Sequence, residues 1–491
     1  MSRSYLFWLF PALTVAAAVA SGRIGTTPAA FLGLIAAIPV AAFTGPVEFA
    51  VGQLMVALAR GLWIGLTIAP YILGGLFFWQ IVVPGARPGA QRALPAAQPS
   101  PTASLAQRRL LFFACFLIGP FAESATGFGV GMLGTIALVR HLGIAPRHLM
   151  VFALMSQTLI PWGGMGSGTM LAAAYARLPA NEIGFYSALP TALLMLVWLP
   201  LFWRTAATAG FTASRQECLR EAAWIAAGLG LLSAATLYLG PEAALLAIYG
   251  PLIAIYYLRD QKPSLQQALA TARQLLPFAL LIGGLALSRL SPALQNTLAS
   301  TAAVAPFSDL PAWPPLYHAG SWLLAGGLLT ALWQGRARSL AQEAISAWKT
   351  GKPAVLAVFL FAMMAEVLSA GGISQAIANG MFSALHQGAL ILTPLLSGAF
   401  GILTNSGNAP NSLFMSSQLA LAIKAGLGIP AVAALQHVSG TSMSLFSPVR
   451  MSIAASLAHG HGQERAVYAT LLPYAAFCFA LLVLMACAVV I

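Results

Sequence analysis

Residues 118–134 read IGPFAESATGFGVGMLG and place a carboxylate, Glu123, inside an otherwise apolar run that begins near Leu110. Glycines follow that acid at positions 127, 129, 131 and 134. Each glycine costs a helix about 1 kcal/mol relative to alanine, so an uninterrupted helix is unfavourable here. We therefore expect a break in the chain beside a buried acid.

The composition defines the class of protein. Of the 491 residues, 59% are hydrophobic and 7% are charged, and the mean hydropathy is +0.83. Many windows of about 20 apolar residues are long enough to cross the roughly 30 Å hydrocarbon layer of a bilayer. The short alternating segments of a membrane β-barrel are missing from the sequence. The sequence therefore predicts an all-α polytopic membrane protein, surrounded by the lipid bilayer and without a sizeable soluble domain.

In such a protein the acidic break has a further meaning. A charged group at the bilayer centre costs about 3 kcal/mol or more, so it normally marks a pathway for an ion or a substrate. Lipid offers no hydrogen bonds to the backbone groups that a break sets free. We expect residues 110–140 to form a re-entrant hairpin whose tip lines a binding cavity.

The distribution of charge predicts the topology. The chain carries 24 Lys and Arg residues against 11 Asp and Glu, a net charge of +13. These cations form no basic stripe, so nucleic acid is not an expected partner. The positive-inside rule places the basic loops in the cytoplasm, and the abundance of Ala and Arg is typical of a GC-rich bacterium, which predicts a bacterial inner (plasma) membrane. Sixteen cations lie in five such loops, at 84–109, 140–148, 204–220, 259–273 and 336–352.

These constraints give about twelve transmembrane helices, with both termini outside. For the first span, which ends in Ala18-Val19-Ala20, the alternative is a removable signal peptide. The plain spans are expected at about 5–20, 28–43, 55–83, 184–203, 220–239, 241–258, 274–290, 314–334, 353–370 and 466–490. The chain is predicted to divide into N-terminal spans with a cytoplasmic loop (1–109), a first repeat core (110–203), connecting spans (204–352) and a second repeat core (353–491).

Two further spans, 149–176 and 429–459, are too long and too polar in the middle for plain helices. The first contains Pro161 followed by GGMGSG at 163–168, and the second contains QHVSGTSMSLFSP at 436–448. Proline removes a helix donor and glycine loosens the turn. Each span is therefore predicted to be two half-helices joined by unwound backbone.

The two halves of the chain repeat the same order of features. Residues 119–174 and 398–456 each begin with Gly-x-Phe, contain a polar break, pass through Leu-Gly-Ile and end in a broken span. The predicted topology enters the first copy from the cytoplasm and the second, through a hairpin near 391–427, from outside. This order indicates an inverted-topology repeat, in which the site lies where the breaks meet. The alternative is that the small residues only allow close packing of helices.

At these breaks the sequence resembles the lactate permease family of proton-linked hydroxy-acid transporters, and the order and spacing of spans are similar from about residue 55 onward. The family's first motif, Phe-x-Glu-Gly-x-x-Gly-Phe-Gly, is matched at Phe121, Glu123, Gly127, Phe128 and Gly129, with Ser124 in place of the first glycine. Its other motifs resemble Gly163, Met165 and Gly166, then Ser406, Asn411, Leu413, Phe414 and Gln418, and finally Ser447-Pro448.

Two positions depart from the family pattern. An Asp of the second-half motif falls at Gly407, and a Lys before the Ser-Pro falls at Ser444. Arg450, just after the Ser-Pro, is placed to supply a cation from a neighbouring position. The resemblance therefore implies a divergent member, whose substrate and coupling ion remain open.

A carrier of a small carboxylate needs hydrogen-bond donors for the anion. Half-helix N-termini supply backbone N–H donors, and side chains at the breaks supply hydroxyls and amides. Arg450 is interpreted as the countercharge of the anion, and the alternative is an arginine that reaches the cytoplasmic interface. The candidate substrate-binding residues are Ser124, Thr126, Gly127, Gly129, Ser156, Gln157, Thr158, Gly163, Asn405, Ser406, Asn408, Asn411, Ser439, Gly440, Thr441, Ser442, Ser444 and Arg450.

Glu123 and His437 are the candidates for proton coupling. Burial in an apolar site favours the neutral form of a carboxyl group, so Glu123 is expected to load a proton together with the substrate. The alternative for Glu123 is a structural acid held by backbone donors. His437 lies in the second broken span, where a histidine can sense pH or bind the anion, and a hydrogen-bonded packing histidine is the equally open alternative.

Together with the resemblance, these features predict a secondary active transporter that imports lactate- or glycolate-like 2-hydroxy acids by proton symport. No cofactor, metal or catalytic residue is expected, sodium is not excluded as the coupling ion, and a homodimer is compatible with the sequence. The alternatives are a sodium-coupled or exchanging carrier of another organic anion, and a channel. A membrane-embedded enzyme is less consistent, because the sequence shows no metal-ligand set, nucleophile–base pair or nucleotide loop.

Overall fold

The computed structural model describes residues 3–83, 104–127 and 129–490. Most of the basic loop 84–109 and Phe128 of the first motif therefore lie outside the described residues. In the described part of the chain the secondary structure is helical, apart from one isolated bridge between Val304 and Trp313. Ten helices there are long and apolar enough to cross a membrane, or eleven if one bent pair counts as a single span. The prediction of an all-α polytopic membrane protein is confirmed.

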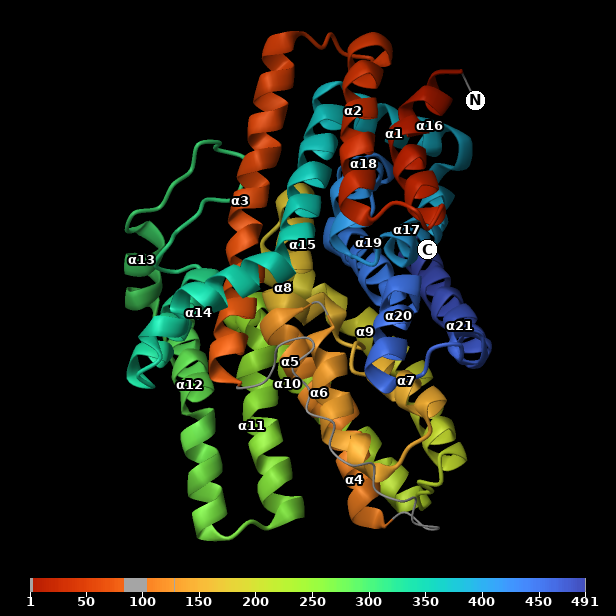
Figure 1. Ribbon diagram of the computed structural model, residues 1–491. Helices are drawn as coiled ribbons and strands as arrows, with labels where there is room; N and C mark the ends of the chain where they lie inside the picture. Colours follow the sequence, from red (N-terminus) through yellow and green to blue (C-terminus); the bar gives the residue numbers. More distant parts are fainter. Residues whose placement is uncertain (1–2, 84–103, 128, 491) are drawn as a thin grey trace.

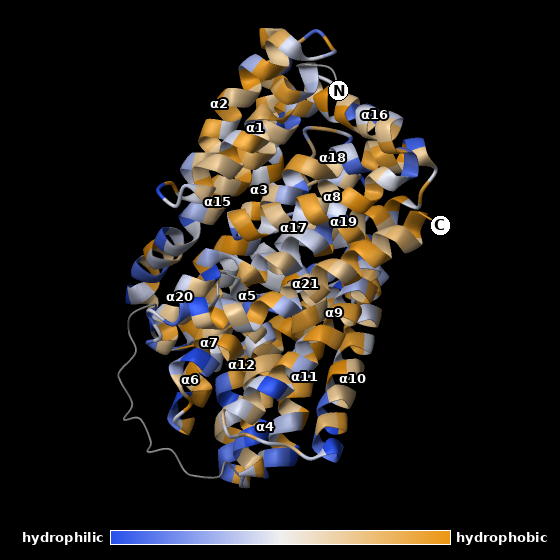
Figure 2. Cartoon of the chain, turned by 90° about the vertical axis from the view of Figure 1, so that its right-hand side faces the viewer, coloured by the Kyte–Doolittle hydropathy of each residue, from blue (hydrophilic) through white to orange (hydrophobic). Residues whose placement is uncertain are grey.

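Most residues of the helices are apolar, and hydrophilic residues gather towards the ends of several helices (Figure 2). The helices before the first repeat core are α1 (Arg3–Ala20), α2 (Thr26–Thr44) and α3 (Val51–Val82). The core contains α4 (Leu105–Phe113), α5 (Gly119–Thr126), α6 (Val130–Val139), α7 (Pro146–Met155), α8 (Gly163–Ala176) and α9 (Ala180–Thr208). A π-helical turn, Ala114–Ile118, joins α4 to α5, so that Leu105–Thr126 forms one span.

The connecting helices are α10 (Arg215–Leu239), α11 (Pro241–Gln261), α12 (Leu265–Leu290), α13 (Pro292–Ser300), α14 (Ala319–Trp333) and α15 (Leu340–Ala370). The chain ends in α16 (Ile373–Leu385), α17 (Leu392–Thr404), α18 (Asn408–Ala425), α19 (Ile429–Met443), α20 (Pro448–Ala458) and α21 (Glu464–Val490). Each expected plain span corresponds to a helix, although the apolar parts of α1 and α14 are shorter than the helices counted above as long enough to cross a membrane. α16 lies between the predicted spans, where no helix was expected.

Small residues allow the long helix α3 to pack closely against α14 and α15. A Cβ atom built on Gly61 would lie 2.4 Å from the Cα of Met363 in α15, and one on Gly320 of α14 would lie 2.4 Å from the carbonyl carbon of Pro70. Such contacts bring helix backbones together where no hydrophobic effect drives association in lipid. This group of helices forms a wall beside the repeat cores (Figure 1).

Both predicted hairpins are present as pairs of adjacent helices, although the first arm of each ends a helix long enough to cross a membrane, Leu105–Thr126 and Ile373–Thr404. In the first, α5 ends at Gly127, whose backbone angles (φ 72°, ψ −160°) are accessible essentially to glycine alone, and α6 returns along α5, with Thr135 Oγ1 donating to the Ala114 carbonyl at 2.9 Å. In the second, Asn405 takes a left-handed conformation (φ 55°) between α17 and α18. The base of that hairpin is joined by a 2.7 Å hydrogen bond from Thr393 to Gln418.

Both expected broken spans are also present. α7 and the segment Ile160–Ala176 are bent by 60° around an unwound stretch, and Gly164, Met165 and Gly166 have left-handed backbone angles inside the second half. In the second broken span, extended backbone at Ser447 (φ −60°, ψ 138°) separates α19 from α20. The glycines and proline of the first span therefore predicted its break correctly, whereas in the second span Gly440 stays inside α19 and only the step at Ser447-Pro448 interrupts the helix.

The two broken spans run antiparallel to each other. Near the start of the first, Met150 and Pro146 pack against Gly460 at the end of the second. Further along, Thr169 of α8 contacts His437 of α19 at 2.9 Å. An inverted-topology repeat requires this antiparallel relation. Figure 1 shows the orange helices α6 and α7 next to the blue helix α20.

Candidate functional site

Glu123 is 4% exposed and lies in α5 at the tip of the first hairpin. Its carboxylate accepts hydrogen bonds from the backbone N–H groups of Gly129, at 3.3 Å, and Gly131, at 3.1 Å. These amides begin α6, where unpaired N–H groups and the helix dipole favour a negative charge. Glu123 therefore closes the hairpin by capping its returning helix.

Arg450 occupies the first turn of α20 and is 9% exposed. Its Nε donates to Asn405 Oδ1 at 3.1 Å, and its Nη1 donates to Gln157 Oε1. Glu123 lies within Coulombic range of the guanidinium, but within the described part of the chain no carboxylate forms an ion pair with Arg450. Arg450 is thus a buried cation held by neutral amides. This placement contradicts the alternative of an arginine that reaches the interface.

Gln157 joins Arg450 to the acidic hairpin. Its Nε2 donates to Ser156 Oγ at 3.2 Å, and a Cβ atom built on Gly131 would lie 2.9 Å from this nitrogen and 3.1 Å from the Glu123 Cβ. Glu123 and Gln157 therefore pack on the same glycine. Glu123, Gln157, Asn405 and Arg450 come from the four predicted breaks, so the breaks converge on one polar cluster.

His437 is fully buried in a second polar cluster. Asn411 Nδ2 donates to the Gly168 carbonyl at 3.1 Å and contacts His437 Nδ1 at 2.9 Å. Thr169 Oγ1 donates to the Pro161 carbonyl at 2.6 Å and contacts His437 Nε2 at 2.9 Å. Because the hydroxyl proton is used, the network assigns the imidazole proton to Nε2 and leaves Nδ1 as the acceptor. This geometry favours the packing role of His437, and its role in proton coupling stays a prediction.

Several polar atoms at the breaks are buried without a hydrogen-bond partner among the described residues. A buried polar group without a partner costs about 1–3 kcal/mol, so a concentration of such groups fits a site for a polar ligand. Among the predicted binding residues they are Ser124 Oγ, Thr158 Oγ1, Asn411 Oδ1 and Ser442 Oγ, and their neighbours Ser412 Oγ and Gln436 Oε1 share the property.

Other predicted hydroxyls bond to carbonyl groups of their own segment. Such residues can offer a ligand a lone pair without a change in the backbone bond. They are Thr126 with Ala122, Ser156 with Ala153, Ser439 with Leu435, Thr441 with His437 and Ser444 with Thr441. Ser406 accepts from the Asn408 backbone N–H at 3.1 Å.

The predicted glycines and Asn408 lie where segments approach closely. A Cβ on Gly163 would be 3.7 Å from the Glu123 Cγ, and one on Gly127 would be 3.5 Å from the Gly164 Cα. A Cβ on Gly440 would be 2.6 Å from the Pro410 ring, and Asn408 Oδ1 would be 3.3 Å from one on Gly168. Gly129 supplies an amide to Glu123. These residues permit the convergence of the breaks, and their predicted roles in substrate binding are not tested by this geometry.

The structure explains one departure from the family pattern. A Cβ atom on Gly407, where the resemblance places an Asp, would lie 2.1 Å from the Thr441 Cγ2. Thr441 therefore fills the space that a side chain at 407 would need. Ser444, at the position of the Lys, is fully buried.

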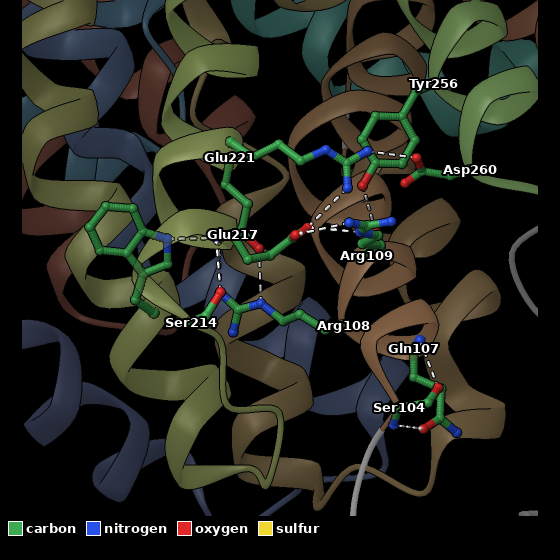
Figure 3. A network of polar contacts seen from close by, with 11 residues as sticks. Ser104, Gln107, Arg108, Arg109, Ser214, Glu217, Glu221, Tyr256 and Asp260 are labelled. Carbon is green, nitrogen blue, oxygen red and sulfur yellow. Dashed lines mark hydrogen bonds and ion pairs between the residues drawn. The ribbon is translucent and has the colours of Figure 1, made fainter.

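The other buried acids differ from Glu123 because they pair with arginines. Figure 3 shows two such pairs between α4 and α10. Arg108 binds both oxygens of Glu221 at 2.9 Å, and Arg109 binds Glu217 at 2.9 Å. Elsewhere Arg289 contacts Glu242 at 3.0 Å. Glu123 instead forms no ion pair within the described residues, and its carboxylate accepts hydrogen bonds from two backbone amides.

A cavity of about 610 Å³ lies beside Arg450. Its walls are the hairpin tip 404–408 with Val449, the turn 25–28, and residues of α15 between 350 and 361. Sequence reasoning singled out Asn405, Ser406 and Asn408 of this wall but missed Thr26, Thr27 and Lys352. Only packing brings the N-terminal turn and α15 to the second hairpin, so no local pattern marked these residues.

Comparison with known proteins shows a similarity to lactate permeases. No protein-family model matches the chain. The L-lactate permeases of Salmonella typhi and Salmonella typhimurium are each 24% identical to it over 478 residues, covering 85% of this chain and 83% of the relative. A match to 85% of the chain is long enough to include residues of both predicted repeat cores. The chain is therefore similar to L-lactate permeases over most of its length, as a divergent relative of that family.

Proposed function

We propose that this multi-pass protein of the bacterial inner membrane is a secondary active transporter that imports small monocarboxylates, with lactate-like 2-hydroxy acids as substrates and protons as the coupling ion. The relatives are named L-lactate permeases, which supports a lactate transporter rather than an enzyme. The observation that carries the proposal is Arg450, a buried cation held by Gln157 and Asn405 instead of by an acid.

The guanidinium geometry suits a carboxylate ligand. Arginine presents five N–H donors in a planar fork, and the contacts with Asn405 and Gln157 use one donor on Nε and one on Nη1. The remaining donors can bind a carboxylate with charge-assisted hydrogen bonds. Unpartnered hydroxyls at Ser124, Thr158 and Ser442 are candidates for the 2-hydroxyl group of the substrate.

Glu123 couples the proton through the hairpin tip. As a carboxylate it accepts from Gly129 and Gly131. A protonated carboxyl carries an O–H donor on one oxygen. That oxygen is then a weaker acceptor for the backbone N–H group that it faces. Loading a proton therefore loosens the bond between Glu123 and the first turn of α6. The anion at Arg450 and the proton on Glu123 would then both bind in the polar cluster where the four breaks meet.

The test is uptake of labelled L-lactate and a panel of other carboxylates into proteoliposomes, with pH and sodium gradients imposed separately. We expect an inward proton gradient to drive accumulation and a sodium gradient to have no effect. Glu123→Gln should keep lactate exchange across the membrane but lose accumulation driven by the pH gradient. Full pH-driven accumulation by Glu123→Gln would refute the coupling role of Glu123, and failure to take up any carboxylate would refute the transport function.

A sodium-coupled or exchanging carrier of another organic anion is the second candidate. It is favoured by one observation, the absence of a side chain at 407 and of a cation at 444, where the resemblance places an Asp and a Lys. Accumulation in response to the sodium gradient, or exchange without response to either gradient, would select this candidate.

A further inference from the structure

The cavity of about 610 Å³ next to the second hairpin has walls of different character. The hairpin wall is polar and includes Asn405, Ser406 and Asn408, whereas α15 contributes mainly apolar residues. Two hydrogen bonds hold the walls together, from Thr26 Oγ1 to the Thr404 carbonyl at 3.2 Å and from Thr27 Oγ1 to the Pro353 carbonyl at 2.7 Å. The cavity is therefore bounded on three sides by residues fixed relative to one another.

The cavity carries a single sign of charge. Lys352 is its one charged lining residue among those the structure describes, and no carboxylate lines it. Lys352 is exposed, and within the described ranges it makes no ion pair or hydrogen bond. A low-dielectric cleft lined by one sign of charge raises the local concentration of the opposite ion. The cavity thus favours anions over cations.

The cavity also reaches the buried cation. Asn405 lines it and accepts the hydrogen bond from Arg450 Nε at 3.1 Å. Val449, the residue before Arg450, is part of the same wall. Asn405 therefore belongs both to the cavity wall and to the hydrogen-bond partners of the guanidinium, and a change of its rotamer would free Arg450 Nε.

We propose that this cavity is the vestibule through which the monocarboxylate passes between solvent and Arg450, with Lys352 capturing the anion and Asn405 handing it on. This inference rests on the proposed function. In the predicted topology loop 336–352 and the turn before α2 face the cytoplasm, so we expect the vestibule to open toward the cytoplasm.

Accessibility of an engineered cysteine tests the vestibule without requiring transport. Ala354→Cys places a thiol on the cavity wall, in a background where the half-buried Cys218 and Cys487 are changed to Ser. We expect a negatively charged thiol reagent to react there faster than a positively charged one, only from the cytoplasmic face, and more slowly in the presence of L-lactate. Ser300→Cys, at an exposed position outside the cavity, is the control and should show none of these effects.

Removal of the capturing charge gives a kinetic test. Lys352→Gln should abolish the reagent preference and raise KM for lactate about two- to five-fold, as expected for one exposed charge, with kcat unchanged. The increase should vanish at high salt because screening removes the attraction. Lys349→Gln, also exposed and on the same helix but outside the cavity, is the matched control with wild-type behaviour expected.

The two proposals fail in different ways. Equal reaction with both reagents, or reaction only from the outer face, would overturn the vestibule while lactate uptake leaves the proposed function intact. If no carboxylate is taken up but the reagent preference and its loss in Lys352→Gln persist, the proposed function is wrong and the monocarboxylate assignment of the vestibule falls with it, leaving an anion-selective cavity for another ligand.

Discussion

Gln157 and Arg450 join the two halves of the molecule, because the guanidinium of the second broken span donates to the amide oxygen of the first. The two residues are 293 positions apart. Gln157 lies in the unwound stretch of the first broken span, and Arg450 lies in the first turn of α20, directly after the extended residue Ser447. The contact therefore depends on both breaks at once and fixes the position of the buried cation.

Arg450 is expected to be the anchor of the carboxylate. Arg450→Gln should lower kcat/KM for lactate about 10- to 100-fold, because a hydrogen bond to a charged group contributes about 1.5–3 kcal/mol. Arg450→Lys should recover part of this loss, since it keeps the charge without the planar fork. Uptake into proteoliposomes measures the effect, with the exposed Arg338 changed to Gln as control. Wild-type kinetics in Arg450→Gln would contradict the anchoring role.

Gly407 is expected to tolerate no side chain while Thr441 keeps its methyl group. A Cβ at 407 would lie 2.1 Å from Thr441 Cγ2, so Gly407→Ala should cost about 1–3 kcal/mol of stability. Thr441→Ser removes the methyl but keeps the hydroxyl that donates to the His437 carbonyl at 2.7 Å, and it should restore part of the loss in the double variant. Thermal unfolding in detergent reports both effects. If Gly407→Ala unfolds at the wild-type temperature, Thr441 does not fill the space beside residue 407.

Substitution of His437 distinguishes a packing role of this residue from a role in proton coupling. His437→Gln leaves Thr169 and Asn411 without their shared partner, which should cost about 1–3 kcal/mol of stability. The pH dependence of uptake should stay unchanged. His461→Gln, at an exposed position, controls for general effects of losing a histidine. A shifted pH profile in His437→Gln alone would support the coupling role instead.

The Arg108–Glu221 pair is expected to behave as a unit. Both side chains are 2% exposed and share two hydrogen bonds of 2.9 Å, so either partner alone would be an uncompensated buried charge. Arg108→Met or Glu221→Met should each destabilise by about 3–5 kcal/mol, and the double variant should lose much less than the sum. Recovery will be incomplete, because Trp203 Nε1 also donates to Glu221 at 2.7 Å. Additive losses in thermal unfolding would rule out this coupling.

Asp309 provides a pH test outside the membrane spans. Its hydrogen bonds from Arg60, at 2.8–2.9 Å, lower its pKa from 3.8 to about 2. A carboxyl with a lowered folded-state pKa stabilises the fold above its unfolded pKa, and that contribution disappears as the pH falls towards the folded pKa. The difference in unfolding temperature between wild type and Asp309→Asn should therefore be constant above about pH 5 and shrink between about pH 4 and pH 2. If the difference in unfolding temperature instead grew as the pH fell, folding would raise the pKa of Asp309 and not lower it.

Sequence alone determined the membrane class, the two hairpins and the two broken spans. These features are local, because apolar runs must span lipid, and the glycines near Glu123, Pro161 and the GGMGSG segment act on their own backbone. The tertiary structure decided which groups at the breaks meet. It placed Arg450 between Asn405 and Gln157, gave Glu123 two amide donors, and brought Lys352 to a cavity beside the second hairpin. Such contacts join residues far apart in the chain, and only the packing of helices against one another sets their distances.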